Sequence, residues 1–106
     1  MFTIQLSAKN IPLEDDVKRL TNEKLKKLEK HIMNFPQDAL KAIIMLKKRT
    51  HRSDDSLYTT TIALYVPSRI LHAHYEGYSL EDSLIGAVDD IEEQLEEYKE
   101  KLLKRH

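Results

Sequence analysis

The sequence of 106 residues contains no cysteine and only two glycines and three prolines. Without cysteine the chain can form neither a disulfide nor a thiolate metal site, which agrees with a reducing cytosol. So few glycines and prolines leave little room for long loops. No apolar run approaches the roughly 18 residues that span a bilayer, and the first residues lack the basic-then-apolar pattern of a secretion signal. These absences favour a cytoplasmic protein that does not enter a membrane.

Motifs that carry chemistry are also scarce. There is no Ser/His/Asp arrangement and no glycine-rich phosphate loop, and carboxylates on a solvated helix lack the burial that would adapt them to acid–base work. His72 and His74 alternate on one expected strand and so share a sheet face, but no third ligand stands at a metal-binding spacing. We therefore expect no enzyme activity, cofactor, metal site or small-molecule substrate, and a structural role for the two histidines.

Charged residues are plentiful and unevenly distributed. Residues 79–106 contain nine acidic and four basic side chains, whereas residues 1–78 contain nine acidic and thirteen basic ones. The formal net charge of −1 is therefore the sum of a basic segment, residues 1–78, and an acidic segment, residues 79–106. Such a split is typical of a nucleic-acid binder, of a protein-binding module, or of a protein that evolved from one of these two classes into the other.

Length and hydrophobic periodicity predict a single α+β domain over residues 1–106. The length suits one domain and is too short for two. Alternating or β-branched stretches predict strands, and apolar residues at steps of three or four predict two helices. The expected elements are a strand at 2–7, a helix at 13–33, strands at 40–48, 57–66 and 70–76, and a second helix from Leu80 onward. Ser79 and Asp82 resemble a capping box at the start of this second helix.

The order β-α-β-β-β-α predicts a four-stranded mixed sheet. The first strand, the first helix and the second strand can form a parallel pair with a right-handed crossover. The remaining strands then add as an antiparallel meander. Each helix has one apolar stripe, so both should pack on one face of the sheet, as in double-stranded-RNA-binding domains. The other face should be largely exposed to solvent, and whether it pairs into a dimer is left open.

Three segments of the chain resemble one bacterial family. Residues 17–30 read Val-Lys-x-Leu-x3-Lys-Leu-x-Lys-Leu-Glu-Lys, and residues 71–77 read Leu-His-Ala-x2-Glu-Gly. The last helix contains Ala87-Val88-Asp89 and Gln94-Leu95-x3-Lys99-x-Lys101. In this order the segments resemble the ribosome hibernation factors, the family of ribosome-associated inhibitor Y and hibernation-promoting factor, also called sigma-54 modulation or S30AE-like proteins. The resemblance covers nearly the whole chain, which is similar to the short members.

The resemblance implies a ribosome ligand. Proteins of this family are expected to bind the small ribosomal subunit, to place basic residues of two adjacent helices against 16S rRNA, and to block the tRNA and mRNA sites during stress or stationary phase. The implied partners are the small subunit and its 16S rRNA, in the cytoplasm and without a membrane. The implied RNA-binding residues are Lys18, Lys24, Lys27, Lys30, Lys99 and Lys101.

A basic segment at 47–55 is expected to form a polar connection between two strands. Its Lys48, Arg49 and Arg52 could contact a phosphate backbone as an RNA-binding loop. The alternative is that these charges only keep a strand-end loop soluble. The residues alone leave both interpretations open.

The last helix departs from the family pattern. Asp90, Glu93 and Glu97 stand where the family usually carries Lys or Arg, and Glu81 replaces the usual aromatic residue. Acids that face RNA remove phosphate contacts and add repulsion. The acidic helix therefore suggests an alternative function, a non-ribosomal regulatory module that binds a basic protein partner. A third interpretation is a solvated helix face supported by Glu–Lys pairs four residues apart.

Overall fold

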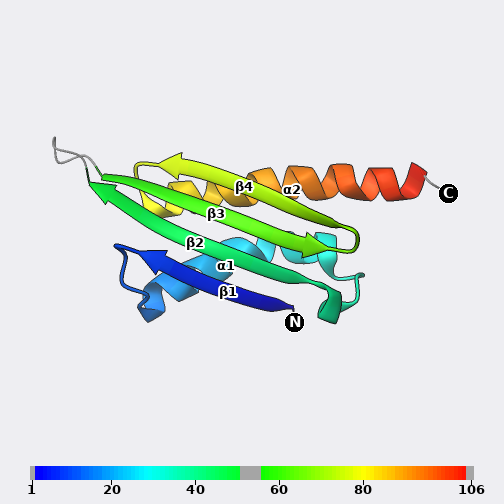
Figure 1. The fold of residues 1–106 in the computed structure, drawn as a ribbon, viewed down its shortest axis with the longest axis horizontal. Helices are drawn as coiled ribbons and strands as arrows, with labels where there is room; N and C mark the ends of the chain where they lie inside the picture. The colour runs from blue at the N-terminus through cyan, green and yellow to red at the C-terminus, as the bar shows by residue number, and fades with distance from the viewer. Residues whose placement is uncertain (1, 51–55, 105–106) are drawn as a thin grey trace.

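The computed structural model describes residues 2–50 and 56–104 and contains four strands, two long helices and one short 3-10 helix (Figure 1). The elements are β1 (Thr3–Lys9), α1 (Asp15–Ile32), η1 (Gln37–Ala39), β2 (Lys41–Thr50), β3 (Ser56–Val66), β4 (Arg69–Gly77) and α2 (Leu80–Lys104). The predicted α+β class and the order β-α-β-β-β-α are confirmed. Neither of the long helices in these ranges is apolar enough to cross a membrane.

The four strands form one mixed sheet in the order β1-β2-β3-β4. β1 runs parallel to β2, and the other two neighbouring pairs are antiparallel. α1 connects the parallel strands and lies with α2 on one side of the sheet, so that the strands stand in front of both helices in Figure 1. The predicted two-layer arrangement is confirmed. The side of the sheet away from the helices, which we call the open face, is not covered by any other described element.

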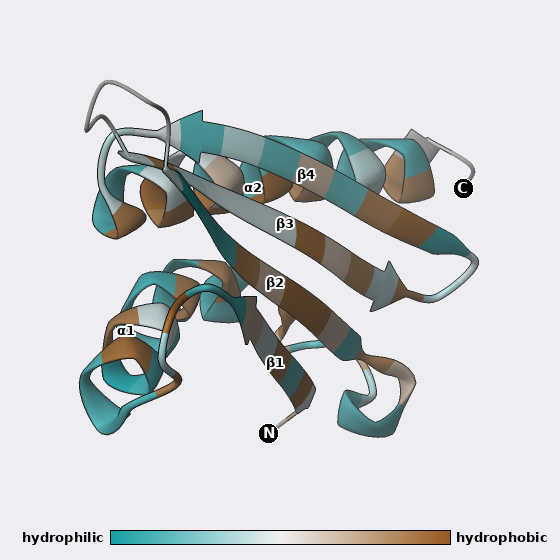
Figure 2. Cartoon of the chain, turned by 60° about the vertical axis from the view of Figure 1, so that its left-hand side comes forward, coloured by the Kyte–Doolittle hydropathy of each residue, from teal (hydrophilic) through white to brown (hydrophobic). Residues whose placement is uncertain are grey.

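Alternation along the strands places the core between the sheet and the helices. In β2, Ala42, Ile44 and Leu46 are buried, and the residues between them are partly or fully exposed. Because successive side chains point to opposite faces of a sheet, one set points toward the helices. Figure 2 shows hydrophobic stretches in β2 and β3, the two central strands. The helices complete the core with Leu25, Leu28, Ile32, Leu84, Ala87, Val88, Ile91, Leu95 and Tyr98.

Two buried hydroxyl groups join α2 to the centre of the sheet. Thr60 on β3 and Ser83 on α2 are fully buried, and their oxygens lie 2.8 Å apart. Ser83 also donates to the Leu80 carbonyl at 2.9 Å. With its hydrogen used in that bond, Ser83 accepts the hydrogen of Thr60. An unpaired buried hydroxyl costs about 1–3 kcal/mol, so this pair holds the first turn of α2 against β3.

β2 extends further than the sequence predicted. We expected a strand to Lys48 followed by a basic loop, but β2 continues to Thr50. Its antiparallel pairing with β3 explains the difference, because the pairing continues up to Thr50 and Ser56. Lys48 and Arg49 are therefore strand residues, and the predicted loop conformation is wrong for these two positions. Their contact with RNA stays a prediction. Arg52 lies outside the described residues.

Ser79 caps α2 as the sequence predicted. The backbone N–H of Asp82 donates to Ser79 Oγ at 3.1 Å. We expect Ser79→Ala to lower the free energy of unfolding by about 1 kcal/mol, because this N–H then has no acceptor inside the protein. Urea unfolding measures the change. Ser79→Asp keeps an oxygen at the cap and should stay close to wild type. A Ser79→Ala protein as stable as wild type would contradict the cap.

Candidate functional site

Three of the four predicted lysines of α1, Lys24, Lys27 and Lys30, face α2 across a line of opposite charges. The two helices are in contact with each other. Where they meet, basic residues of α1 stand against acidic residues of α2, within ion-pair distance. We call this line the inter-helix seam. Its members are Lys24, Lys27, Lys30 and His31 of α1, and Glu81, Asp89, Glu92 and Lys99 of α2.

Lys27 lies at the centre of the inter-helix seam. Its Nζ is 2.5 Å from Asp89 Oδ1 and 3.4 Å from Glu92 Oε1. Lys30 approaches the same Glu92 carboxylate at 3.8 Å, and Lys24 pairs with Glu81 at 3.5 Å nearer the start of α2. The Glu92 side chain is only 16% exposed, so its pairs are less screened by water than ordinary surface ion pairs. The seam therefore compensates much of the basic charge of α1 internally.

His31 links the carboxylate of Glu92 to the ammonium of Lys99. The His31 Nε2 atom is 3.1 Å from Glu92 Oε2, and Lys99 Nζ is 2.8 Å from His31 Nδ1. A lysine ammonium can only donate, so Nδ1 is the acceptor in that bond. The ring hydrogen then belongs on Nε2, which donates to Glu92. This geometry places the imidazole ring between a cation and an anion.

The charges of the seam shift two pKa values. The hydrogen bond to Asp89 raises the pKa of Lys27 above its ordinary value. Burial by itself would raise the pKa of Glu92, but the hydrogen bond from His31 and the charges of Lys27 and Lys30 together lower it. Both shifts favour the charged forms. The lysine and the carboxylate at the centre of the seam are therefore ionised at neutral pH.

We expect the stabilising effect of Glu92 to depend on pH. Its pKa is lower in the folded protein than the ordinary 4.5, so the unfolded chain takes up its proton first as the pH falls. The contribution is complete above pH 4.5 and is lost as the pH falls through the lower, folded-state pKa. At pH 7, Glu92→Gln should lower the free energy of unfolding by about 1 kcal/mol, and at pH 3 by less.

Urea unfolding of wild type and Glu92→Gln at both pH values checks this expectation. Glu97→Gln is the matched control, because Glu97 is exposed and forms no ion pair with any described residue. The control should leave the stability at pH 7 unchanged. A constant difference between wild type and Glu92→Gln at the two pH values would show that charge is not the source of the effect.

The six predicted RNA-binding lysines do not form one cluster. Lys18 stands nine residues before Lys27, which places the two on opposite sides of an α-helix. Lys101 lines a separate pocket with Arg69 and Tyr98, at the turn between β3 and β4. The remaining four belong to the inter-helix seam, namely Lys24, Lys27, Lys30 and Lys99.

The three acids singled out in the sequence lie outside the seam. Asp90 accepts a hydrogen bond from Gln94 at 3.1 Å, and Gln94 also donates to the His72 carbonyl on β4 at 2.6 Å. Asp90 therefore lies on the side of α2 that faces β4. Glu93 and Glu97 are exposed, and no ion pair of either side chain is found among the described residues. Among the described residues, none of the three forms an ion pair with a lysine of α1.

The acids that form ion pairs with the lysines of α1 were not predicted from the sequence. Glu81, Asp89 and Glu92 are separated by eight and three residues, and such steps keep side chains on one helix face. The spacing of these acids in the sequence therefore indicates an acidic stripe along α2. It does not reveal what the stripe meets, because that depends on how the two helices pack.

One group in the described part of the chain has the composition of a metal site. The ligand atoms of His31, Glu92 and Glu96 lie within 4.8 Å of one another. However, Lys99 donates to His31, and Lys27 pairs with Glu92. A divalent cation would have to displace these ammonium groups and to sit beside their charge. The residues present therefore suit an ion-pair network better than a metal ion.

The two histidines of β4 are both exposed on the open face. His74 Nδ1 is 3.0 Å from Thr61 Oγ1 on β3, and this bond connects neighbouring strands. It supports a structural role for His74, and the same role for His72 stays a prediction. The basic residues just before the 51–55 segment, Lys48 and Arg49, contact side chains of neighbouring strands. Lys48 lies over the ring of Tyr58 at 5.6 Å, and Arg49 is 3.5 Å from Glu76.

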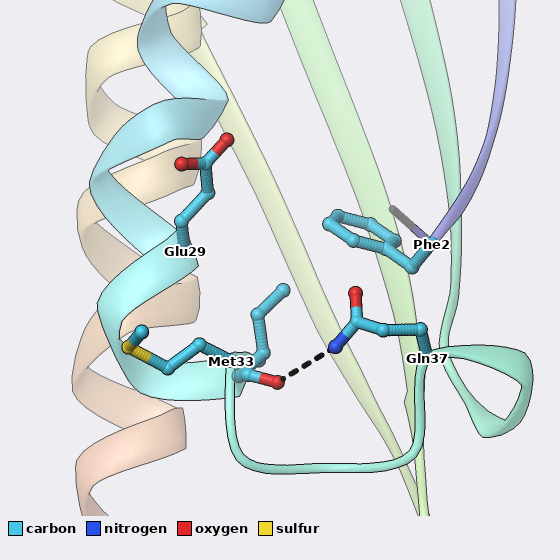
Figure 3. A pocket seen from close by; sticks show the side chains of 5 residues that line it. Phe2, Glu29, Met33 and Gln37 are labelled. Carbon is cyan, nitrogen blue, oxygen red and sulfur yellow. Dashed lines mark hydrogen bonds between the residues drawn. The ribbon is translucent and has the colours of Figure 1, made fainter.

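A pocket of about 260 Å³ lies between the start of β1 and the end of α1 (Figure 3). Its lining consists of Phe2, Glu29, Ile32, Met33 and Gln37. Gln37 donates to the Ile32 carbonyl at 3.2 Å, so its amide supports the local backbone. Glu29 is the one titratable side chain in this lining, and a single carboxylate offers no acid–base pair. The pocket gives no support to catalysis.

A comparison with protein-family models shows the family to which the chain belongs. The family model described as "Sigma 54 modulation protein / S30EA ribosomal protein" matches residues 4–103. The chain belongs to this family. The relationship predicted from the three sequence segments is therefore confirmed. No curated protein is significantly similar to this family member.

Two solved structures share the fold of this family member. The N-terminal domain of Protein Y from Thermus thermophilus has a TM-score of 0.72 at 19% identity, over 92% of this chain and 99% of that one. A ribosomal subunit interface protein from Coxiella burnetii has a TM-score of 0.70 at 16% identity, over 92% of this chain and 98% of that one. At identities this low, the likenesses establish the fold alone.

Proposed function

We propose that this family member is a ribosome-associated translation inhibitor that binds the small ribosomal subunit through 16S rRNA. The observation that carries the proposal is the family match over residues 4–103. The similar structure from Coxiella burnetii is a ribosomal subunit interface protein, which supports the same partner. In this proposal the protein acts by binding during stress or stationary phase, and it performs no reaction.

The lysines of the inter-helix seam supply RNA contacts in this proposal. The Lys27 and Lys30 side chains are 48% and 70% exposed, so their ammonium groups reach solvent although they are paired. A phosphate can replace a carboxylate, because both are anionic acceptors of the same hydrogen bonds. Asp89 and Glu92 would then remain close to the phosphate and repel it. We therefore infer weak, strongly salt-dependent contacts through the seam.

Inhibition in this proposal is steric. The chain measures 54 × 24 × 18 Å. A body of this size seated between RNA surfaces excludes mRNA and tRNA from the same space. We expect the protein to reduce tRNA binding to programmed small subunits in a filter-binding assay. Unchanged tRNA binding at a protein concentration that saturates the subunit would contradict the blocking mechanism and leave the association itself intact.

Sucrose-gradient sedimentation tests the association. Purified protein mixed with ribosomes at low salt should appear in the small-subunit and whole-ribosome fractions. Raising the salt concentration should release it, because phosphate contacts weaken as counterions compete. Protein that stays at the top of the gradient at low salt would refute ribosome binding. Isolated large subunits serve as the control for the choice of subunit.

The exposed acids of α2 support a second candidate, the binding of a basic protein partner. Glu93 and Glu97 are exposed and lie outside the seam, so their charges are available to a partner. Reversal of both to Lys separates the two functions. Stronger ribosome binding by the reversed protein would favour a ribosome ligand with a weakened RNA surface. Loss of a co-purifying basic protein would favour the second candidate.

A further inference from the structure

The sheet and the helices of this protein carry opposite charge. α1 contains six basic and four acidic residues, and α2 contains three basic and nine acidic ones, so the helices together carry −4. The four strands contain six basic residues and one acidic residue, a net charge of +5. A polyanion is therefore attracted to the sheet more than to the helical layer.

Most of the basic strand residues point to the open face. Lys9 of β1 is in register with Lys47 of β2, so two ammonium groups stand side by side. Lys41 lies on the same face, because it alternates with the buried residues of β2. Arg49 also alternates to this face, where it is 3.5 Å from Glu76. Glu76 is the one carboxylate that the described strands place there.

An apolar and aromatic platform lies beside these charges. Tyr65 of β3 pairs with Lys41 on one side and with Ile70 on the other. Met45, Ile70 and Tyr65 are 49%, 43% and 36% exposed, which is high for large apolar side chains in a sheet. His72 shares the open face in the row next to Ile70. The platform offers apolar and aromatic contacts on the same face as the ammonium groups.

We propose that the open face binds single-stranded RNA. Phosphates would lie along Lys9, Lys47 and Lys41, and unpaired bases would stack on Tyr65 and the neighbouring apolar side chains. Single-stranded nucleic acid is typically held in this way, by a basic track that follows the backbone and by aromatic side chains that take the bases. The inference rests on the proposed function for the identity of the RNA, and it adds a contact surface separate from the inter-helix seam.

Charge favours RNA over a second copy of the chain as the occupant. A symmetric dimer through the open face would bring the same patch of each copy together. The basic patch of Lys9, Lys41 and Lys47 would then oppose an equally basic patch, which disfavours association. RNA supplies the opposite charge together with flat bases. It therefore matches both the basic and the apolar part of the face.

Fluorescence anisotropy with a single-stranded RNA of about 12 nucleotides tests the inference on the full chain. We expect Lys9→Gln with Lys47→Gln to weaken binding by about tenfold and to reduce the salt slope by roughly 1.4, for two lost phosphate contacts. Tyr65→Ala should weaken binding by at least about fivefold through lost stacking and should leave the salt slope unchanged. Thermal unfolding of each variant confirms that it is folded.

The matched control is Arg19→Gln with Lys26→Gln. Both residues are exposed on α1, and the pair removes the same charge away from the open face and the seam. The control should lose less than about twofold in affinity, as expected for net charge alone. Equal losses in the control and in the sheet variants would overturn the inference. Absence of binding by the wild-type chain would also overturn it.

Three further outcomes separate RNA binding by the open face from the alternatives. Self-association in analytical ultracentrifugation that Tyr65→Ala abolishes, without a change in RNA binding, would assign the face to a second copy and overturn the inference. The oligonucleotide assay does not involve ribosomes, so it can fail while the sedimentation assay succeeds. In that case the proposed function stands and the open face is not its RNA contact. Sheet-dependent RNA binding without ribosome association would support the inference and refute the proposed function.

Discussion

Substituting Asp89 by Asn and Glu92 by Gln should increase the affinity of the protein for the small ribosomal subunit about tenfold at low salt. The two carboxylates hold Lys27 and Lys30 in the folded protein. The amides remove an intramolecular competitor of the RNA phosphates and a source of repulsion. Two freed lysines should also steepen the dependence of log K on log salt by roughly 1.4–1.8. Sedimentation or anisotropy titrations at several salt concentrations measure both changes.

Asp90→Asn with Glu93→Gln is the matched control for this prediction. It removes the same two charges with the same spacing on α2, at positions outside the inter-helix seam. A change in net charge alone should strengthen binding by only about twofold. If both double variants bind equally well, the lysines of the seam are not RNA contacts. Binding then depends on another surface, and the open face is the first to test.

Replacing Gly86 by Ala should destabilise the protein by about 1–2 kcal/mol, although Ala is the better helix former by about 1 kcal/mol. Gly86 lies in α2, and a Cβ atom built there would run into the ring of Tyr75 on β4. The ring must then leave its place against the helix and lose its contacts. Urea unfolding at neutral pH measures the loss.

A double-mutant cycle with Tyr75→Ala isolates the cause. Without the ring, Gly86→Ala should be stabilising by about 1 kcal/mol, because only the helix propensity remains. The coupling between the two positions should therefore be about 2–3 kcal/mol. Gly86→Ala that stabilises the protein with Tyr75 in place would show that the ring swings aside freely, and would remove close packing as the reason for glycine.

Local periodicity was sufficient to predict the order of the elements. Alternation in β1, steps of three and four in α1 and α2, and the break at Gly77 each depend on residues close together in the chain. The cap at Ser79 was predictable for the same reason, since its acceptor and donor are three residues apart. The end of β2 could not be predicted from local sequence. Arg49 and Thr50 belong to the strand only because β3 pairs with them.

The ion pairs of the candidate site depend on how the two helices pack, which local sequence does not reveal. The basic character of α1 and the acidic character of α2 were visible in the sequence, but not which acids meet which lysines. The choice of Asp89 and Glu92 over Asp90 and Glu93 depends on which face of α2 is turned toward α1. Neighbouring residues on a helix point about 100° apart, so the identity of the partner changes completely with one step along the chain.

The sequence by itself therefore determined the elements, their order, the family and the separation of charge along the chain. These depend on local backbone geometry and on the order of residue types. Only the tertiary structure decided that Lys24, Lys27 and Lys30 of α1 are paired internally, that most basic strand residues lie on the open face, and that Gly86 faces Tyr75. The physical reason is that these features join residues far apart in the chain, and their contacts exist only once the sheet has paired and the helices have packed.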